Sequence, residues 1–366
     1  MTEYYFTTII RQILTKQYAD RADTIFSKSK LLQYVNEKTV SANKGSKSRG
    51  SFANLYAIYV LIEDYINNGF LKSNKKYSEY EGAIFSNLMK RQRELPFGAK
   101  LQNHALNSRM NEEFRKFFPS CEQHPIVRDL KEQRYWINEQ LLIIKIEKKE
   151  YNIASVIITI INKYIETKQE AFKNFVSQCH QLQKAKDIKA ENINAFIFSL
   201  LNPNMDARLF EIVSFAILKR LYSDRIIYWG YSKDNLKKEN IKLYKTGRTN
   251  ANDGGIDFVM RPLGRFFQAT ETLDFKKYFL DIDKLEHYPV TFVVKSDENI
   301  DLILKTIQEN ALKTYGIKRV VESYMNCIEE IINLPTLKQI TESMSSQALK
   351  DVLEEIIRQS NVEFNQ

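Results

Sequence analysis

The sequence predicts an α/β (α+β) protein, in which a large and mostly helical N-terminal region precedes a mixed-sheet region that ends in helices. Apolar residues recur at helical spacing up to about residue 185, short apolar runs alternate with helical stretches between about 190 and 300, and helical spacing then returns. A chain of 366 residues is long enough for two domains, or for one large domain with a helical appendage, and 43% hydrophobic residues suffice for a packed core. We therefore expect two domains, 1–185 and 186–366.

The N-terminal helices are predicted from stripes of apolar residues that repeat every three or four positions. The stripes comprise Ile9, Ile10, Ile13 and Leu14, and then Leu55, Ile58, Tyr59, Ile62 and Ile66. A third helix is expected over 107–118, because Pro119 cannot continue it.

The second region is predicted to alternate helices with strands. Helices are expected over 206–222 and 276–287, and strands over 226–230, 255–260, 265–271 and 290–294. The turn Pro262-Leu263-Gly264 joins the middle two strands. From 300 to the end, only helices are expected.

Composition narrows the classes of function. The three cysteines and four histidines are scattered, which argues against a disulfide framework or a zinc site and favours a cytoplasmic, reducing location. The longest apolar run, 153–161, is half the length of a membrane span, so no membrane partner is expected. A net charge of +9 favours a polyanion such as nucleic acid, although general solubility would explain the same charge.

The segment with most chemical content is Asn252-Asp253-Gly254-Gly255-Ile256-Asp257, followed by Gln268-Ala269-Thr270-Glu271. Two glycines bring the chain sharply into a strand, and Asp257 lies early in that strand. The next strand presents Gln268 and Thr270 on one face and Glu271 on the other. A hairpin of this length places Asp257 beside Gln268.

Oxygen ligands in this arrangement suit Mg²⁺, which takes one or two carboxylates, carbonyls and waters. Asp257 supplies a carboxylate, Gln268 or Glu271 a second oxygen, and Glu211 of the preceding helix a third. Each residue also has a structural explanation. Asp257 could cap backbone donors, Glu211 could pair with Arg208, and Glu271 points away from Gln268. Asp281 and Asp283 are expected on a solvated helix face.

The pattern GG-x-D-hydrophobic, turn, hydrophobic-Q-x-x resembles the active-site hairpin of the PD-(D/E)xK nucleases, including variants with Gln at the second acidic position. An upstream helix with a glutamate, here Glu211, is also typical of that superfamily. The stretch QATETLDFKKYFLDIDK with PVTFVVK after it is similar to type II restriction enzymes, the AccI family among them. The resemblance covers about 205–296. It implies a mixed sheet flanked by helices, Mg²⁺, and cleavage of double-stranded DNA.

The chain departs from the superfamily pattern at one position. The lysine expected two residues after Gln268 is Thr270 here. Lys276 or Lys277 could reach back from the following helix, and Lys245 from the preceding strand, with Lys276 assigned to the catalytic set. Otherwise the protein binds DNA without cutting it.

Two segments are candidates for DNA contact. The small-residue basic loop ending at 51 carries Lys44, Lys47 and Arg49 at the start of a helix, where backbone amides and cations bind phosphate. The second segment, 100–109, groups side chains that suit base edges: Asn103, His104, Asn107 and Arg109. A flexible loop and a plain polar helix start would explain the same residues.

The expected partners follow from the resemblance. Double-stranded DNA is the substrate, a homodimer matches a palindromic site, and a cognate DNA methyltransferase is the genetic partner. A helical scaffold whose hairpin is purely structural is the remaining alternative.

Overall fold

The computed structural model describes residues 5–40, 48–71, 76–99, 101–185, 189–202, 205, 207–246 and 256–364, without the side chains of 48–50, 207 and 364. The chain divides into two compact units, 1–174 and 175–364, and the division falls inside one long helix, α7 (Ala154–Lys184). None of the described helices is long and apolar enough to cross a membrane.

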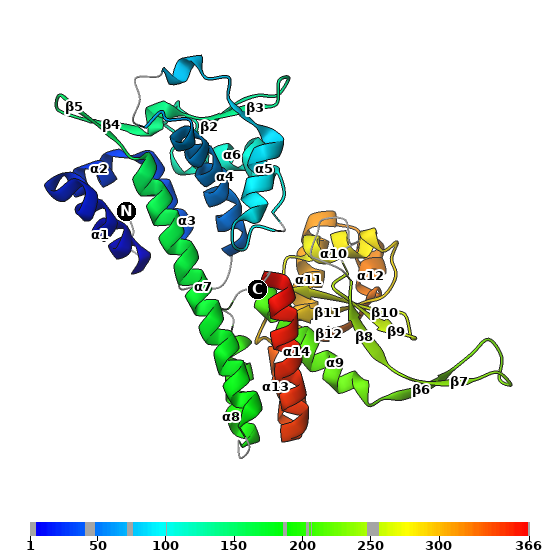
Figure 1. Ribbon diagram of the computed structural model, residues 1–366. Helices are drawn as coiled ribbons and strands as arrows, with labels where there is room; N and C mark the ends of the chain where they lie inside the picture. Colours follow the sequence, from blue (N-terminus) through cyan, green and yellow to red (C-terminus); the bar gives the residue numbers. More distant parts are fainter. Residues whose placement is uncertain are drawn as a thin grey trace. The chain divides into compact units, whose positions relative to one another are not determined.

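Unit 1 packs helices around α4, as Figure 1 shows. Its other helices are α1 (Tyr5–Tyr18), α2 (Ala22–Lys28), α3 (Lys30–Thr39), α5 (Phe85–Glu94), α6 (Met110–Phe117) and the first part of α7, with α4 spanning Ser48–Asn67. Ser29 starts α3 by accepting a hydrogen bond from the Leu32 backbone N–H (3.1 Å). The two predicted stripes lie on α1 and α4, and Ile10, Leu14, Leu55, Ile58 and Ile62 are buried.

Five short strands of unit 1 were not predicted. They are β1 (Ala83–Ile84), β2 (Ile126–Asp129), β3 (Arg134–Ile137), β4 (Ile143–Ile146) and β5 (Lys149–Asn152). β2 and β3 form a hairpin that β1 extends, and β4 and β5 form a second hairpin. Strands of two to four residues carry too few alternating positions to be recognised from the sequence.

Unit 2 is built on one five-stranded mixed sheet with the order β12-β11-β10-β9-β8. The strands are β8 (Lys242–Lys245), β9 (Phe258–Arg261), β10 (Arg265–Thr270), β11 (Val290–Val294) and β12 (Ile328–Ile332). β8, β9 and β10 are antiparallel neighbours, and β10, β11 and β12 run parallel. The predicted turn is present, with Gly264 at φ +71°, where a residue without Cβ is favoured.

Helices cover both faces of this sheet (Figure 1). One face, through Phe258, Phe267 and Val293, packs against a group that includes α9 and α14. The other face, through Phe292 and Val294, packs against α10, α11 and α12. The helices of unit 2 after α7 are α8 (Ala190–Leu200), α9 (Ala207–Ser223), α10 (Phe275–Lys284), α11 (Ile300–Tyr315), α12 (Lys318–Met325), α13 (Leu334–Glu342) and α14 (Ser346–Phe364).

The predicted α/β (α+β) class with a mixed sheet and flanking helices is confirmed. The exclusively helical C-terminal part is wrong, because β12 adds a parallel edge strand to the sheet. Only Ile331 and Ile332 of β12 are buried, while Glu329 and Glu330 face outward, so the strand lacks a long apolar run. A further hairpin, β6 (Ile226–Trp229) with β7 (Lys237–Asn240), leaves the core between α9 and β8.

Candidate active site

The hairpin of β9 and β10 brings Asp257 beside Gln268. The Asp257 backbone N–H donates to the Phe267 carbonyl (2.9 Å), and its Oδ2 accepts from the Ala269 backbone N–H (2.7 Å). These bonds hold Asp257 to both chain neighbours of Gln268. The carboxylate therefore caps a backbone donor, as the structural explanation required, while it lies next to the predicted second ligand. The glycines before Asp257, residues 254 and 255, lie outside the described residues.

Gln268 is a buried polar side chain, only 7% exposed. Its Nε2 donates to the Ala269 carbonyl (3.2 Å), whereas its Oε1 accepts no hydrogen bond from any described residue. A buried amide oxygen without a donor costs about 1–3 kcal/mol unless another group engages it. Gln268 therefore presents a buried amide oxygen that no described residue engages, one position before the Ala269 N–H that donates to Asp257.

Glu211 reaches the same end of the sheet from the first turns of α9. Its Oε1 lies 2.7 Å from Nζ of Lys245, and both side chains are mostly buried, at 13% and 16% exposure. Lys245 pairs in register with Phe258, and the next residue, Thr246, donates its N–H to the Asp257 carbonyl (3.0 Å). The Glu211–Lys245 pair is therefore anchored beside the start of β9.

A second lysine–glutamate pair lies at the adjacent end of β10 and β11. Nζ of Lys295 is 2.5 Å from Oε1 of Glu271, also donates to the Met205 carbonyl, and lies 5.8 Å from the centre of the Phe210 ring. The Lys295 side chain is 2% exposed, and that of Glu271 is 38% exposed. The Lys295 backbone N–H donates to the Thr270 carbonyl (2.9 Å), so the two main chains are neighbours, while the Lys295 side chain lies on the α9 face with Glu271.

Lys295 is the residue that sequence reasoning missed. The run VTFVV, 290–294, is predicted as a buried strand, and a lysine directly after a fully buried strand is the available signal. Charged side chains are almost never buried without a partner or a task.

The lysines assigned from the sequence are placed differently. The Lys276 side chain is exposed at the start of α10, and among the described residues no contact joins it to Asp257 or Gln268. Lys277 and Lys284 both pair with Asp281, at 2.6 and 3.3 Å. The solvated helix face expected for Asp281 is wrong, because this carboxylate is fully buried under the two lysine stems.

The side chains predicted to contact DNA lie in unit 1. Lys44 and Lys47 fall outside the described residues, and Arg49 belongs to α4 by its backbone only. Near the start of α6 the chain forms a π-helical turn, Ala105–Arg109, on which Arg109 is exposed, and Asn103 and His104 precede it, also exposed. Asn107 is partly buried and accepts from the Tyr135 hydroxyl (3.1 Å), which favours a structural role for it.

The arrangement around Asp257 fits a hard divalent cation. Among the described residues no three His, Cys, Asp or Glu side chains gather as a ready metal cage. Mg²⁺ does not need one, since it commonly uses one or two carboxylates and completes its shell with waters and substrate phosphate. Asp257 offers a carboxylate, and Gln268 offers a buried amide oxygen that accepts no hydrogen bond from the described residues; both are ligand types that Mg²⁺ uses.

No protein-family model, curated protein or solved structure matches this chain.

Proposed function

We propose that the chain is a Mg²⁺-dependent endonuclease that hydrolyses phosphodiester bonds in double-stranded DNA at a specific short sequence, as type II restriction enzymes do. The proposal rests on the side chains that gather at one end of the unit 2 sheet. There the Asp257 carboxylate accepts from the backbone N–H next to the buried Gln268, and two mostly buried lysines, each paired with a glutamate, lie on the α9 face of the same end of the sheet. A mixed sheet flanked by helices is also what the sequence resemblance implies.

In this proposal Asp257 and Gln268 hold the metal. When bound, Mg²⁺ polarises the phosphate and lowers the pKa of the attacking water. The Ala269 N–H of β10 holds the Asp257 carboxylate in place just before β9, which limits the reorganisation that metal binding requires. Gln268 contributes an oxygen without adding charge, so the site repels the phosphate less than a pair of carboxylates does.

The two lysines take the role of the absent motif lysine. Lys295 is the stronger candidate, because its ammonium group is the more deeply buried of the two and lies at the ends of β10 and β11, paired with Glu271. Its ammonium group is desolvated, and a positive charge in such surroundings stabilises developing negative charge more than it does in water. Glu271 and Glu211 keep Lys295 and Lys245 oriented, and Glu211 remains the third oxygen available to the metal.

A second candidate function is a DNA-binding protein that does not cut. The observation in its favour is Thr270, which is 6% exposed and holds the Thr272 N–H (3.3 Å) where the family pattern has lysine. Plasmid digestion separates the two functions. Discrete fragments that form with Mg²⁺ and not with EDTA support the nuclease, whereas binding without cleavage of any of several plasmids supports the second function.

The homodimer and the cognate methyltransferase belong to the same proposal. A two-fold enzyme matches the two-fold symmetry of palindromic DNA. Sedimentation of the protein with and without a cleaved duplex tests the dimer, and a strictly monomeric species that cuts both strands in one binding event contradicts it.

A further inference from the structure

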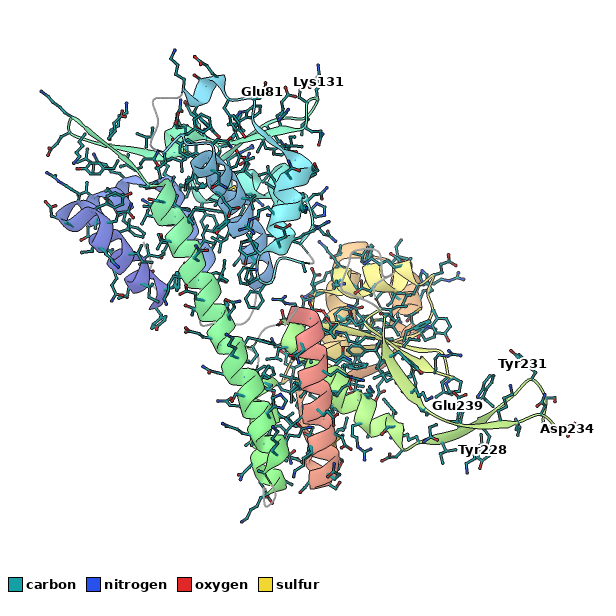
Figure 2. All side chains as sticks on the ribbon, viewed as in Figure 1. Glu81, Lys131, Tyr228, Tyr231, Asp234 and Glu239 are labelled. Carbon is teal, nitrogen blue, oxygen red and sulfur yellow. The ribbon has the colours of Figure 1, made fainter. Side chains whose placement is uncertain are left out.

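The β6–β7 hairpin stands away from the core of unit 2 as an arm. Figure 2 shows Tyr228, Tyr231, Asp234 and Glu239 spread along it. Every described residue from 230 to 238 is exposed, and Tyr231 at the tip is 99% exposed. An isolated two-stranded hairpin is marginally stable in water, so an arm that keeps this shape needs internal bracing or a partner.

One face of the arm is braced by its own side chains. Trp229 Nε1 donates to Glu239 Oε2 across the strands (3.0 Å), and Nζ of Lys237 lies 5.9 Å from the centre of the Trp229 ring. At the tip, a Cβ on Gly230 would lie 2.0 Å from the Asn235 carbonyl oxygen, so the close turn requires glycine there. The two strands of the arm are therefore held together by their own side chains and turn.

The opposite face carries large apolar and basic side chains that stay exposed among the described residues. Pairing places Ile226 and Tyr228 opposite Asn240 and Lys238 on this face. Ile226 is 47% exposed, Tyr228 64% and Leu236 54%. Exposed tyrosines beside lysines form an amphipathic surface that is typical of an interface.

The net charge of the arm indicates which kind of partner its exposed face would bind. The segment from 224 to 242 contains five basic and three acidic residues. Two of the acidic residues are engaged within the chain, Asp224 with Arg220 (2.6 Å) and Glu239 with Trp229 (3.0 Å). Among the described residues only Asp224 of the three is paired with a cation, and the segment keeps an excess of basic over acidic residues, which favours a polyanion over a second copy of the same positive arm.

We infer that the β6–β7 arm is a ribbon that enters a groove of duplex DNA, with its lysines on phosphates and Tyr228 and Tyr231 against the groove. A two-stranded ribbon fits the major groove of B-DNA. The inference rests on the proposed function, because β8 connects the arm to the Lys245 end of the site. At roughly 3.3 Å per residue, the arm tip lies at most about 40 Å from Lys245 along the strands, which corresponds to about twelve base pairs.

The test compares Lys233→Ala/Lys238→Ala with Lys305→Ala/Lys313→Ala, which removes two exposed lysines from α11 of the same unit. Affinity for a random-sequence 40-bp duplex is measured in EDTA across a salt series, so that cleavage plays no part. We expect the arm variant to bind at least about tenfold more weakly and its log K–log salt slope to fall by about 1.8, while the control stays near wild type. Tyr228→Ser/Tyr231→Ser should also weaken binding, and hydrogen exchange of 226–240 should slow when the duplex is added.

The outcomes separate the arm from the nuclease. If wild-type protein cuts plasmid and the arm variant binds and cuts equally well, the inference is overturned and the nuclease stands. If wild-type protein does not cut but the arm variant loses binding, the nuclease fails and the inference stands. If the arm variant changes from dimer to monomer in sedimentation with unaltered DNA affinity per protomer, a second copy occupies this face and the inference is overturned.

Discussion

Replacing Lys295 with methionine separates catalysis from stability at the proposed site. Methionine matches the lysine stem in length, so the packing against Phe210 is kept while the ammonium group is removed. Glu271 loses its partner, but it is 38% exposed and water can solvate it. Removing one member of a buried ion pair costs about 3–5 kcal/mol when the remaining charge stays buried. Because water can reach Glu271, we expect Lys295→Met to lower the free energy of unfolding by only about 1–2 kcal/mol.

Lys295→Met should lower the rate of DNA cleavage much more than its small effect on the free energy of unfolding would explain. Removing one preorganised positive or hydrogen-bonding group from a desolvated site costs about 10²–10³-fold in rate. The rate of plasmid cleavage with Mg²⁺ and urea unfolding are measured on the same preparations. Lys219→Met is the matched control, because Lys219 also pairs with a glutamate, Glu355 (3.0 Å), and lies over a phenylalanine ring, Phe215 (5.7 Å). Cleavage within threefold of wild type by folded Lys295→Met would refute the role of this lysine.

Three further predictions follow from individual residues. Gln268→Leu should lower the cleavage rate at least about tenfold and raise the Mg²⁺ concentration that gives half-maximal cleavage. Gln268→Glu should lower that Mg²⁺ concentration. Equal rates for both variants would exclude Gln268 as a ligand. Replacing Lys44, Lys47 and Arg49 of the 41–51 loop with alanine should lower the log K–log salt slope of DNA binding by about 2–3. An unchanged slope would show that the loop is only a linker. Burial raises the pKa of the Cys179 thiol to about 12, so iodoacetamide at pH 8 should leave it unlabelled until the protein unfolds, and rapid labelling of folded protein would contradict its burial.

The hairpin and its neighbours were predictable because their signals are local. Two glycines, a Pro-Leu-Gly turn and alternating apolar residues predict the β9–β10 hairpin. Its register brings Asp257 to Phe267 and Ala269, the two chain neighbours of Gln268. The fully buried strand β11 was read from five consecutive residues with strong strand preference. The helices α1, α4, α9 and α10 followed from apolar spacing in the same way.

The missed features depend on contacts between distant parts of the chain. β12 is half exposed and becomes a strand only because β11 offers it an edge. Lys295 and Glu271 are 24 positions apart, and their pairing depends on the parallel register of β10 and β11. The burial of Asp281 is a local exception: it pairs with Lys277 and Lys284 on its own helix, an arrangement that helical spacing permits but does not require.

The most direct test of the nuclease proposal is digestion of plasmid DNA by wild type, Asp257→Ala and Asp257→Asn, with Mg²⁺ and with EDTA. Asparagine keeps an oxygen that can accept from the Ala269 N–H and removes only the charge, so a carboxylate that merely caps this donor would tolerate it. We predict discrete fragments from wild type with Mg²⁺ alone, no cleavage by either variant, and DNA binding by both that equals or exceeds wild type. Cleavage by Asp257→Asn at the wild-type rate would contradict the proposed metal site.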